Sequence, residues 1–251
     1  MQKSLFTVLT TFIFLCNIQA QVSISKVKFG VQVSPNISWM GTNDNNIKGN
    51  GINTGLKLGV TADYYFLENY AISTGLGFAF NQGGKIIHDE GGNFLTKSTL
   101  SDSRLNQDTK SLAPGVKIRY HVQYLEVPFG LKLRTQQFGY LRAFAEAPMF
   151  TVGIATKAIG DIYDPVLTTP FLKENIKPDV NKLAMSWGFG GGVQYDVSQS
   201  TALIAGLYFQ KGFTDVTKDG NAKKVTATAG EKDETSKATL GNITLRLGIV
   251  F

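Results

Sequence analysis

Apolar and polar residues alternate with a period of two in segment after segment of this chain. Near the end of the chain, for example, Ile243, Leu245, Leu247 and Ile249 alternate with polar or small residues. Such alternation is typical of β-strands that have one face in an apolar and one face in a polar environment. The pattern predicts eight strands, at residues 27–33, 54–66, 70–81, 125–134, 140–155, 183–197, 201–212 and 242–251.

The connections between these segments alternate between short and long. The short links are residues 67–69, 135–139 and 198–200, and the long polar links are about 40–53, 82–114, 156–182 and 213–237. A barrel inserted into the outer membrane from the periplasm has short turns inside and long loops outside. We therefore predict an all-β fold, an eight-stranded antiparallel transmembrane β-barrel with short periplasmic turns and long extracellular loops.

The two faces of the predicted strands differ in side-chain size. Large apolar residues stay on one face, while the other face is rich in Gly, Ala and Ser with a few charges. Eight strands leave an interior only wide enough for side chains. Small residues such as Gly188, Gly190 and Gly192 would not fill an apolar core, so we expect them to line a narrow polar interior and the apolar face to meet lipid.

Segment 140–155 has the least regular alternation. An arginine that faces lipid at mid-depth costs about 2–4 kcal/mol, so we expect Arg142 and Glu146 to point inward. On a regular strand, Phe150 then shares their inner face, and Met149 lies on the outer face.

Charged residues of both signs fall on the predicted inner face, and we expect them to form an ion-pair network. The candidates are Glu126, Lys132, Arg142, Glu146 and Arg246, with Lys57, Asp63, Arg134 and Asp196 also turned inward. Glu126 is expected near Lys132, Arg142 or Arg246. Structural packing of the interior is the favoured role, and a narrow ion path is the alternative.

Lys117 and Arg119 precede the strand at 125–134. If that strand keeps one phase, they point outward above the lipid and contact lipopolysaccharide phosphates as charge-assisted donors. A bulge near Tyr124 would reverse the phase, because Ile118 and Val122 belong to a competing apolar set.

The first twenty residues form a different kind of segment. Lys3 precedes an apolar run that includes Cys16, and the small residue Ala20 precedes an expected cleavage at Gln21. This pattern predicts a secretory signal peptide at 1–20 and a barrel domain at 21–251. Cys16 is the one cysteine of the sequence, so the mature chain is expected to lack disulfide and thiol chemistry.

Composition narrows the partners and the chemistry. The sequence carries a net charge of +6, but its basic residues form no aromatic-interleaved stripe, so no nucleic-acid partner is expected. Nucleophilic catalysis needs a pair such as Ser with His, and neither His88 nor His121 has an evident serine partner. The cluster at 88–90 lacks a repeated metal-ligand spacing. We expect no enzyme, no cofactor and no metal.

The run Tyr124-Leu125-Glu126-Val127-Pro128-Phe129-Gly130-Leu131-Lys132 resembles the central motif of the PorT-like outer-membrane β-barrel family of Bacteroidetes. The Ala20-Gln21 junction and the ending at 245–251 are similar to that family as well. The sequence departs from it at Glu146-Ala147-Pro148, where many members have a Gly-Pro pair. The resemblance implies an integral outer-membrane barrel and fixes no function. The terminal Phe251 resembles the signal read by the outer-membrane assembly machinery.

These observations predict a non-enzymatic integral outer-membrane protein. Its loops or rim are expected to contact lipopolysaccharide, a ligand, or a partner protein of a secretion or envelope assembly. A lipid-modifying outer-membrane enzyme and a small channel are the alternatives.

Overall fold

The computed structural model describes residues 26–102, 112–167, 169–218, 223–226, 230–233 and 236–251, so the expected signal peptide lies outside the described residues. The described strands are β1 (Val27–Thr42), β2 (Ile47–Leu67), β3 (Tyr70–His88), β4 (Gly91–Asn93), β5 (Val116–Arg134), β6 (Leu141–Tyr163), β7 (Phe171–Asn175), β8 (Leu183–Asp196), β9 (Ala202–Gly212), β10 (Lys223–Thr226), β11 (Gly230–Asp233) and β12 (Ala238–Val250). One short 3-10 helix, Lys177–Asp179, follows β7.

Eight of these strands close into a ring. They run in the order β5-β3-β2-β1-β12-β9-β8-β6, every pairing is antiparallel, and β5 pairs with β6 to complete the barrel. β7 extends β6 outside the ring, and β4, β10 and β11 form a separate small sheet. No helix among the described residues is long and apolar enough to cross a membrane. The predicted eight-stranded antiparallel barrel is confirmed.

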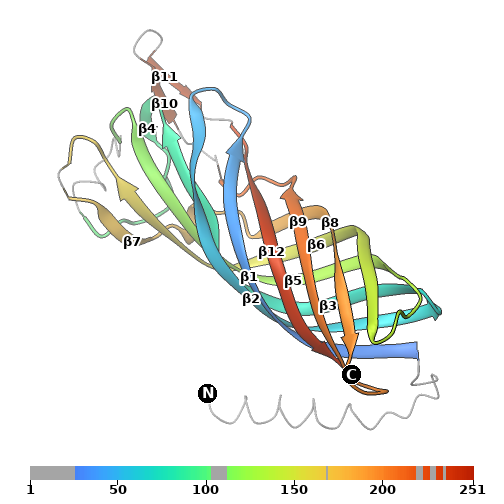
Figure 1. Cartoon of the computed structure of the whole chain (residues 1–251). Helices are drawn as coiled ribbons and strands as arrows, with labels where there is room; N and C mark the ends of the chain where they lie inside the picture. Colours follow the sequence, from blue (N-terminus) through green and yellow to red (C-terminus); the bar gives the residue numbers. More distant parts are fainter. Residues whose placement is uncertain (1–25, 103–111, 168, 219–222, 227–229, 234–235) are drawn as a thin grey trace.

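The barrel has a turn end, where the short links lie, and a loop end (Figure 1). The C-terminus lies at the turn end, and β4, β7, β10 and β11 gather at the loop end. Short turns of such barrels face the periplasm. Several strands are far longer than the ~9–11 residues needed to cross a bilayer, with 21 residues in β2 and 23 in β6. They continue past the membrane and form the wall of the loop-end half of the barrel, which we call the head.

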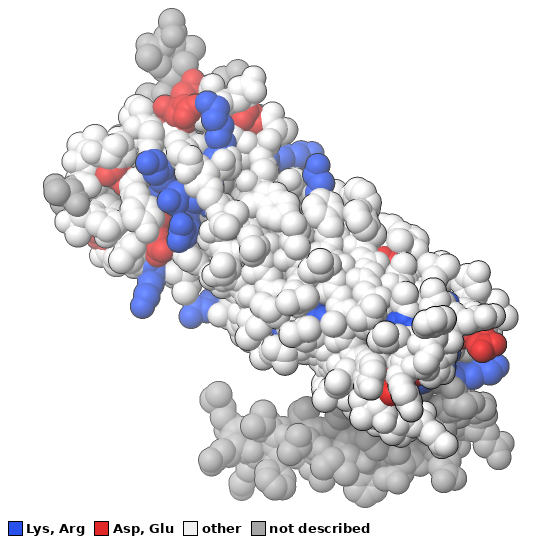
Figure 2. Space-filling view, viewed as in Figure 1, with Lys and Arg blue, Asp and Glu red and all other residues white. Residues whose placement is uncertain are grey.

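Apolar side chains cover the outside of the turn-end half. The exposed set includes Phe29, Val31, Leu58, Val60, Leu76, Phe78, Val127, Phe129, Val152, Ile154, Phe189, Leu207, Leu245 and Leu247. Figure 2 shows the middle of the molecule almost free of charge, while Lys and Arg gather toward the loop end. The predicted orientation, with large apolar residues toward lipid, is confirmed.

The interior is polar only in the turn-end half. In the loop-end half it holds a hydrophobic core that includes Met40, Ile86, Val116, Ile118, Tyr120, Val122, Tyr124, Ala158, Ile162 and Ile176. The predicted polar interior is therefore limited to the turn-end half, and most residues of this apolar core fall in segments that the sequence analysis assigned to loops. Above the membrane the outside of the barrel meets water, so the apolar side chains move inside, as in a soluble protein.

β6 changes phase at one bulge. Its pairing shifts between Glu146 and Met149, at Ala147-Pro148, which has a cis peptide bond. Arg142 and Glu146 lie on the inner face as predicted, but the bulge turns Met149 inward and Phe150 outward. The expected placement of Met149 and Phe150 was therefore wrong, because one extra residue reverses the faces of a strand.

β5 keeps a single phase along its whole length. Val116 and Tyr124 are buried on the same face as Lys132, while Lys117 lies exposed on the other. The irregularities near Tyr124 fall instead in the neighbouring strands, where β3 and β6 each carry extra residues opposite it.

Candidate functional site: interior ion pairs and the outer rim

Glu146 lies at the centre of the ionic cluster in the turn-end half. Arg246 donates from Nη1 to both of its carboxylate oxygens, at 3.0 and 2.9 Å. The same guanidinium bonds Tyr208 Oη at 2.8 Å and lies 3.7 Å from the centre of its ring. Gly190 makes room for that ring, since a Cβ there would lie 2.1 Å from it. The glycine thus permits a large aromatic to support the arginine.

A second pair packs against the first. Lys132 Nζ lies 2.6 Å from Asp63 Oδ2 and 3.9 Å from Glu146 Oε1, and its side chain and those of both acids are almost fully buried. The ammonium also lies 4.8 Å from the ring centre of Phe144. Lys132, Glu146 and Arg246 therefore lie in one cluster.

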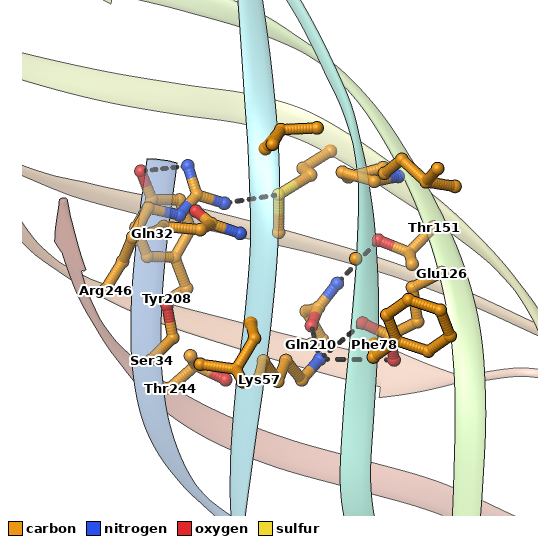
Figure 3. A pocket seen from close by; sticks show the side chains of 16 residues that line it. Gln32, Ser34, Lys57, Phe78, Glu126, Thr151, Tyr208, Gln210, Thr244 and Arg246 are labelled. Carbon is orange, nitrogen blue, oxygen red and sulfur yellow. Dashed lines mark hydrogen bonds and ion pairs between the residues drawn. The ribbon is translucent and has the colours of Figure 1, made fainter. Parts of the chain in front are cut away.

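The third pair differs from the expected one. Glu126 bonds Lys57, with Nζ–Oε2 at 3.0 Å, rather than Lys132, Arg142 or Arg246. Lys57 also donates to Gln210 at 3.0 Å, and Gln210 donates to Thr151 at 2.7 Å. Figure 3 shows this chain of contacts on one side of a cavity, with Arg246 and Tyr208 on the other. Lys57 lies on β2, two strands from β5, so sequence spacing gave no signal for the pair.

Arg142 lies apart from this cluster, at the turn end. Its Nε is 3.4 Å from Asp196 Oδ2, and Gln194 donates to the other oxygen of that carboxylate at 2.6 Å. The predicted inward set is thus divided between a central cluster and a pair at the periplasmic mouth.

The central pairs leave little free space. Three cations, Lys57, Lys132 and Arg246, balance three acids, Asp63, Glu126 and Glu146. The cavity between them measures about 40 Å³, room for a few water molecules. Among the described residues, no group of three or more His, Cys, Asp or Glu side chains is placed to hold a metal ion. The arrangement favours packing of the interior over an ion path.

Carboxylates attach the segments that cover the loop end. Asp179 accepts from the backbone of Lys97 and Ser98 at 3.0 and 2.8 Å, and also from the Ser98 hydroxyl. Glu174 accepts from Ser101 in the same way, with 2.8 Å to the backbone nitrogen. Charge-assisted bonds of this kind are among the stronger ones in proteins, so the segment before residue 103 is held over the apolar core.

Lys117 and Arg119 lie on the outer face of β5, above the apolar band. Lys85 on β3 is the register partner of Arg119, and its Nζ lies 5.8 Å from the ring centre of Tyr163. Arg119 Nε is buried and has no hydrogen-bond partner among the described residues. These three cations are called the rim patch below.

His121 follows the rim patch on the same face, toward the membrane. Its Nε2 lies 3.0 Å from Asp161 Oδ2, and its Nδ1 contacts Asn81 Oδ1. Asn81 donates its own amide to the Thr54 carbonyl at 2.8 Å, which directs its oxygen toward the ring. Both ring nitrogens therefore contact side-chain oxygens of neighbouring strands. Sequence analysis noted His121 but gave no signal for these partners.

A closed ring of eight antiparallel strands with a lipid-facing apolar band defines an integral β-barrel of the outer membrane. A family model described as "Outer membrane protein beta-barrel domain" matches residues 19–218, and the chain belongs to that family.

Solved structures of the same kind are similar to this chain at low sequence identity. Neisserial surface protein A is 10% identical with a TM-score of 0.41, covering 88% of this chain and 95% of its own. The attachment invasion locus protein Ail of Yersinia pestis is 9% identical with a TM-score of 0.36, covering 90% and 99%. A major outer membrane protein from Thermus thermophilus is 12% identical with a TM-score of 0.39, covering 90% and 98%. No curated protein matches the sequence.

Proposed function

We propose that this protein is a closed, non-enzymatic outer-membrane barrel whose rim binds the phosphate groups of lipopolysaccharide. The observation that carries the proposal is the rim patch of Lys85, Lys117 and Arg119. It lies on the outer face of β3 and β5, six to eight residues along the strands from Leu125 and Phe78 toward the loop end.

The charge pattern of the patch supports an anionic partner. Lys85 and Arg119 are directly opposite on neighbouring strands, where like charges destabilise a sheet. Asp161, opposite Arg119 on its other side, already contacts His121. A phosphate bound by the guanidinium and the two ammonium groups would offset this repulsion through charge-assisted hydrogen bonds.

Two features support this function over the alternatives. The apolar core of the loop-end half, with Ile118, Tyr120 and Tyr124 inside, favours a closed barrel over a channel. The partners of His121 are Asn81 and Asp161, and neither is the hydroxyl or thiol nucleophile that a histidine base activates.

The placement in the PorT-like branch and the contact with assembly machinery belong to the same proposal. The motif at 124–132 supports the branch. Phe251 supports the assembly contact, because its exposed side chain lies at the turn end, where its backbone bonds Phe29.

The rim patch is tested by the variant Lys117→Glu/Arg119→Glu. Barrels in nanodiscs of neutral lipid are titrated with labelled lipopolysaccharide, and heat-modifiable migration on gels reports folding. We expect the affinity to fall about tenfold or more, because attraction becomes repulsion at the headgroup level. Lys211→Glu/Lys237→Glu makes the same charge change at exposed lysines outside the patch. Equal affinities for the two variants would refute the role of the patch.

A further inference from the structure

A hollow opens in the outer wall of the barrel next to the rim patch. Its volume is about 490 Å³, and it is bounded by β3, β5, β6 and β7. Phe80, Ile159 and Leu172 give it apolar walls, and Lys157 and Lys173 contribute ammonium groups. We call it the rim hollow.

Irregular backbone surrounds this hollow on three sides. The pairing of β3 shifts beside Asn81, that of β6 beside Lys157, and that of β7 beside Lys173. Bulges redirect side chains and are common beside functional sites.

Two of these residues also have a costly backbone conformation. Among the described residues, Asn81 (φ 58°) and Lys173 (φ 62°) are the non-glycine residues with positive φ, and both line the rim hollow. Left-handed backbone is unfavourable for lysine in particular, and such strain gathers at binding and active sites. The fold holds Lys173 there through its backbone N–H, which donates to Asp161 at 2.9 Å.

The charge in the hollow is positive. Lys157 and Lys173 are its two lysines, and Asp161 is the one acid among the lining residues. That carboxylate is already used by the imidazole and by the Lys173 backbone. The two ammonium groups, both on exposed residues, remain for a ligand.

The position of the hollow indicates what fills it. Gln123 and Lys157, which are register partners, line it, and the next outward residues toward the turn end are Leu125 and Ile154, on the lipid-facing band. A ligand seated there has a polar part among cations and an apolar part that continues along the barrel wall. That combination describes an amphiphile of the outer leaflet.

From these observations we infer that the rim hollow binds the phosphorylated sugar headgroup of an outer-leaflet glycolipid. Lys157 and Lys173 would bind the phosphate, the Asn81 and Gln123 side chains would face the sugar, and Leu172 and Phe80 would contact the first methylenes of the acyl chains. This inference rests on the proposed function and adds a built site, separate from the rim patch, with its own residues.

The test compares Lys157→Glu/Lys173→Glu with the wild-type barrel and with the control Lys211→Glu/Lys237→Glu. Folded barrels are titrated in neutral nanodiscs with bisphosphorylated lipid A and with its dephosphorylated form, and bound lipid is counted by native mass spectrometry. We expect wild type and control to prefer the phosphorylated form. The hollow variant should lose at least about tenfold in affinity for it while its rim patch stays intact.

The outcomes separate this inference from the proposed function. Unchanged affinity in the hollow variant, together with a loss in Lys117→Glu/Arg119→Glu, overturns the hollow and leaves the patch. A wild-type barrel that does not distinguish the two lipids overturns both. Inorganic phosphate that competes at micromolar concentration overturns the lipid headgroup as the ligand, because the acyl contacts would then contribute nothing. The uncharged variant Leu172→Asn checks the apolar wall and should weaken lipid A binding without changing the charge beside either lysine, and unchanged binding would remove the acyl contact from the inference.

Discussion

Glu146 connects two cations of different strands in the barrel interior. It accepts two hydrogen bonds from Arg246 and lies 3.9 Å from Lys132, and only 2% of its surface is exposed. A buried charge that loses its partner keeps its full desolvation cost. Removal of this carboxylate alone should therefore destabilise the barrel more than removal of the carboxylate together with its cationic partner.

The variant Glu146→Gln is expected to lower the free energy of unfolding by about 3–5 kcal/mol, because it leaves Arg246 buried without a counter-charge. The double variant Glu146→Gln/Arg246→Met restores the charge balance and should be less destabilised than the single one. Urea unfolding in lipid vesicles measures both. A double variant that loses at least the sum of the two single losses would show no favourable coupling between Glu146 and Arg246, and would contradict the prediction.

The inward position of these residues was predictable, but their partners were not. Arg142 and Glu146 had to point inward, since lipid does not tolerate a charge at mid-depth. The pair Lys57–Glu126 joins β2 to β5 across β3, and Glu146–Arg246 joins β6 to β12 across the interior. Such contacts depend on the stagger of the closed sheet, which no single strand pattern contains.

At the scale of the elements, β5 decides how the rim is built. Its inner face passes from charged residues such as Lys132 to apolar ones such as Ile118 without a change of phase. The same strand therefore presents Leu125 to lipid and Lys117 to water. The neighbouring strands β3 and β6 contain the irregularities instead, as bulges beside Asn81 and Lys157.

The phase of β5 is tested by single cysteines at Lys117 and Ile118. In cells treated with a membrane-impermeant maleimide, Lys117→Cys should be labelled and Ile118→Cys should not, because Ile118 is fully buried. Labelling after denaturation gives the total for each variant. The mature chain is expected to lack cysteine, so no background label interferes. The opposite pattern would mean that the strand reverses its faces at Tyr124.

The sequence pattern located every strand of the ring but underestimated how far several of them extend. Alternation in β5 continues to Val116, yet its apolar set changes from the outer to the inner face beside Tyr124, which looks like a break. The same exchange ends the membrane-type pattern in β2, which begins at Ile47 rather than near residue 54. In both cases the medium outside the barrel changes from lipid to water, and the alternation alone does not reveal that change.

The whole molecule combines two modes of filling a barrel. Balanced charges pack the half inside the membrane, and a hydrophobic core that includes Val122 and Ile162 packs the half above it. The segment around residues 97–101, which covers that core, is attached through Asp179 and Glu174. We therefore expect a rigid head above a closed membrane-spanning half, the stem. The binding surfaces of the protein should then lie on the outer wall of the barrel and not in a pore.

This closed state predicts that the purified barrel gives no stable openings in planar bilayers. The variant Glu174→Ala/Asp179→Ala removes the acceptors of the segment around Lys97 to Ser101, so limited proteolysis should cut that segment several times faster than in wild type. Conductance should nevertheless stay at baseline, because Ile118 and Tyr124 still fill the interior beneath the segment.

Asp89→Ala, which removes an exposed partner of Lys48, serves as the control and should leave the cleavage rate unchanged. Stable openings in wild type would contradict a packed stem. Openings that occur only in the double variant would mean that the segment around residues 97–101, and not the side chains beneath it, blocks ion flow. In that case Tyr124→Ala in the wild-type background would leave conductance at baseline.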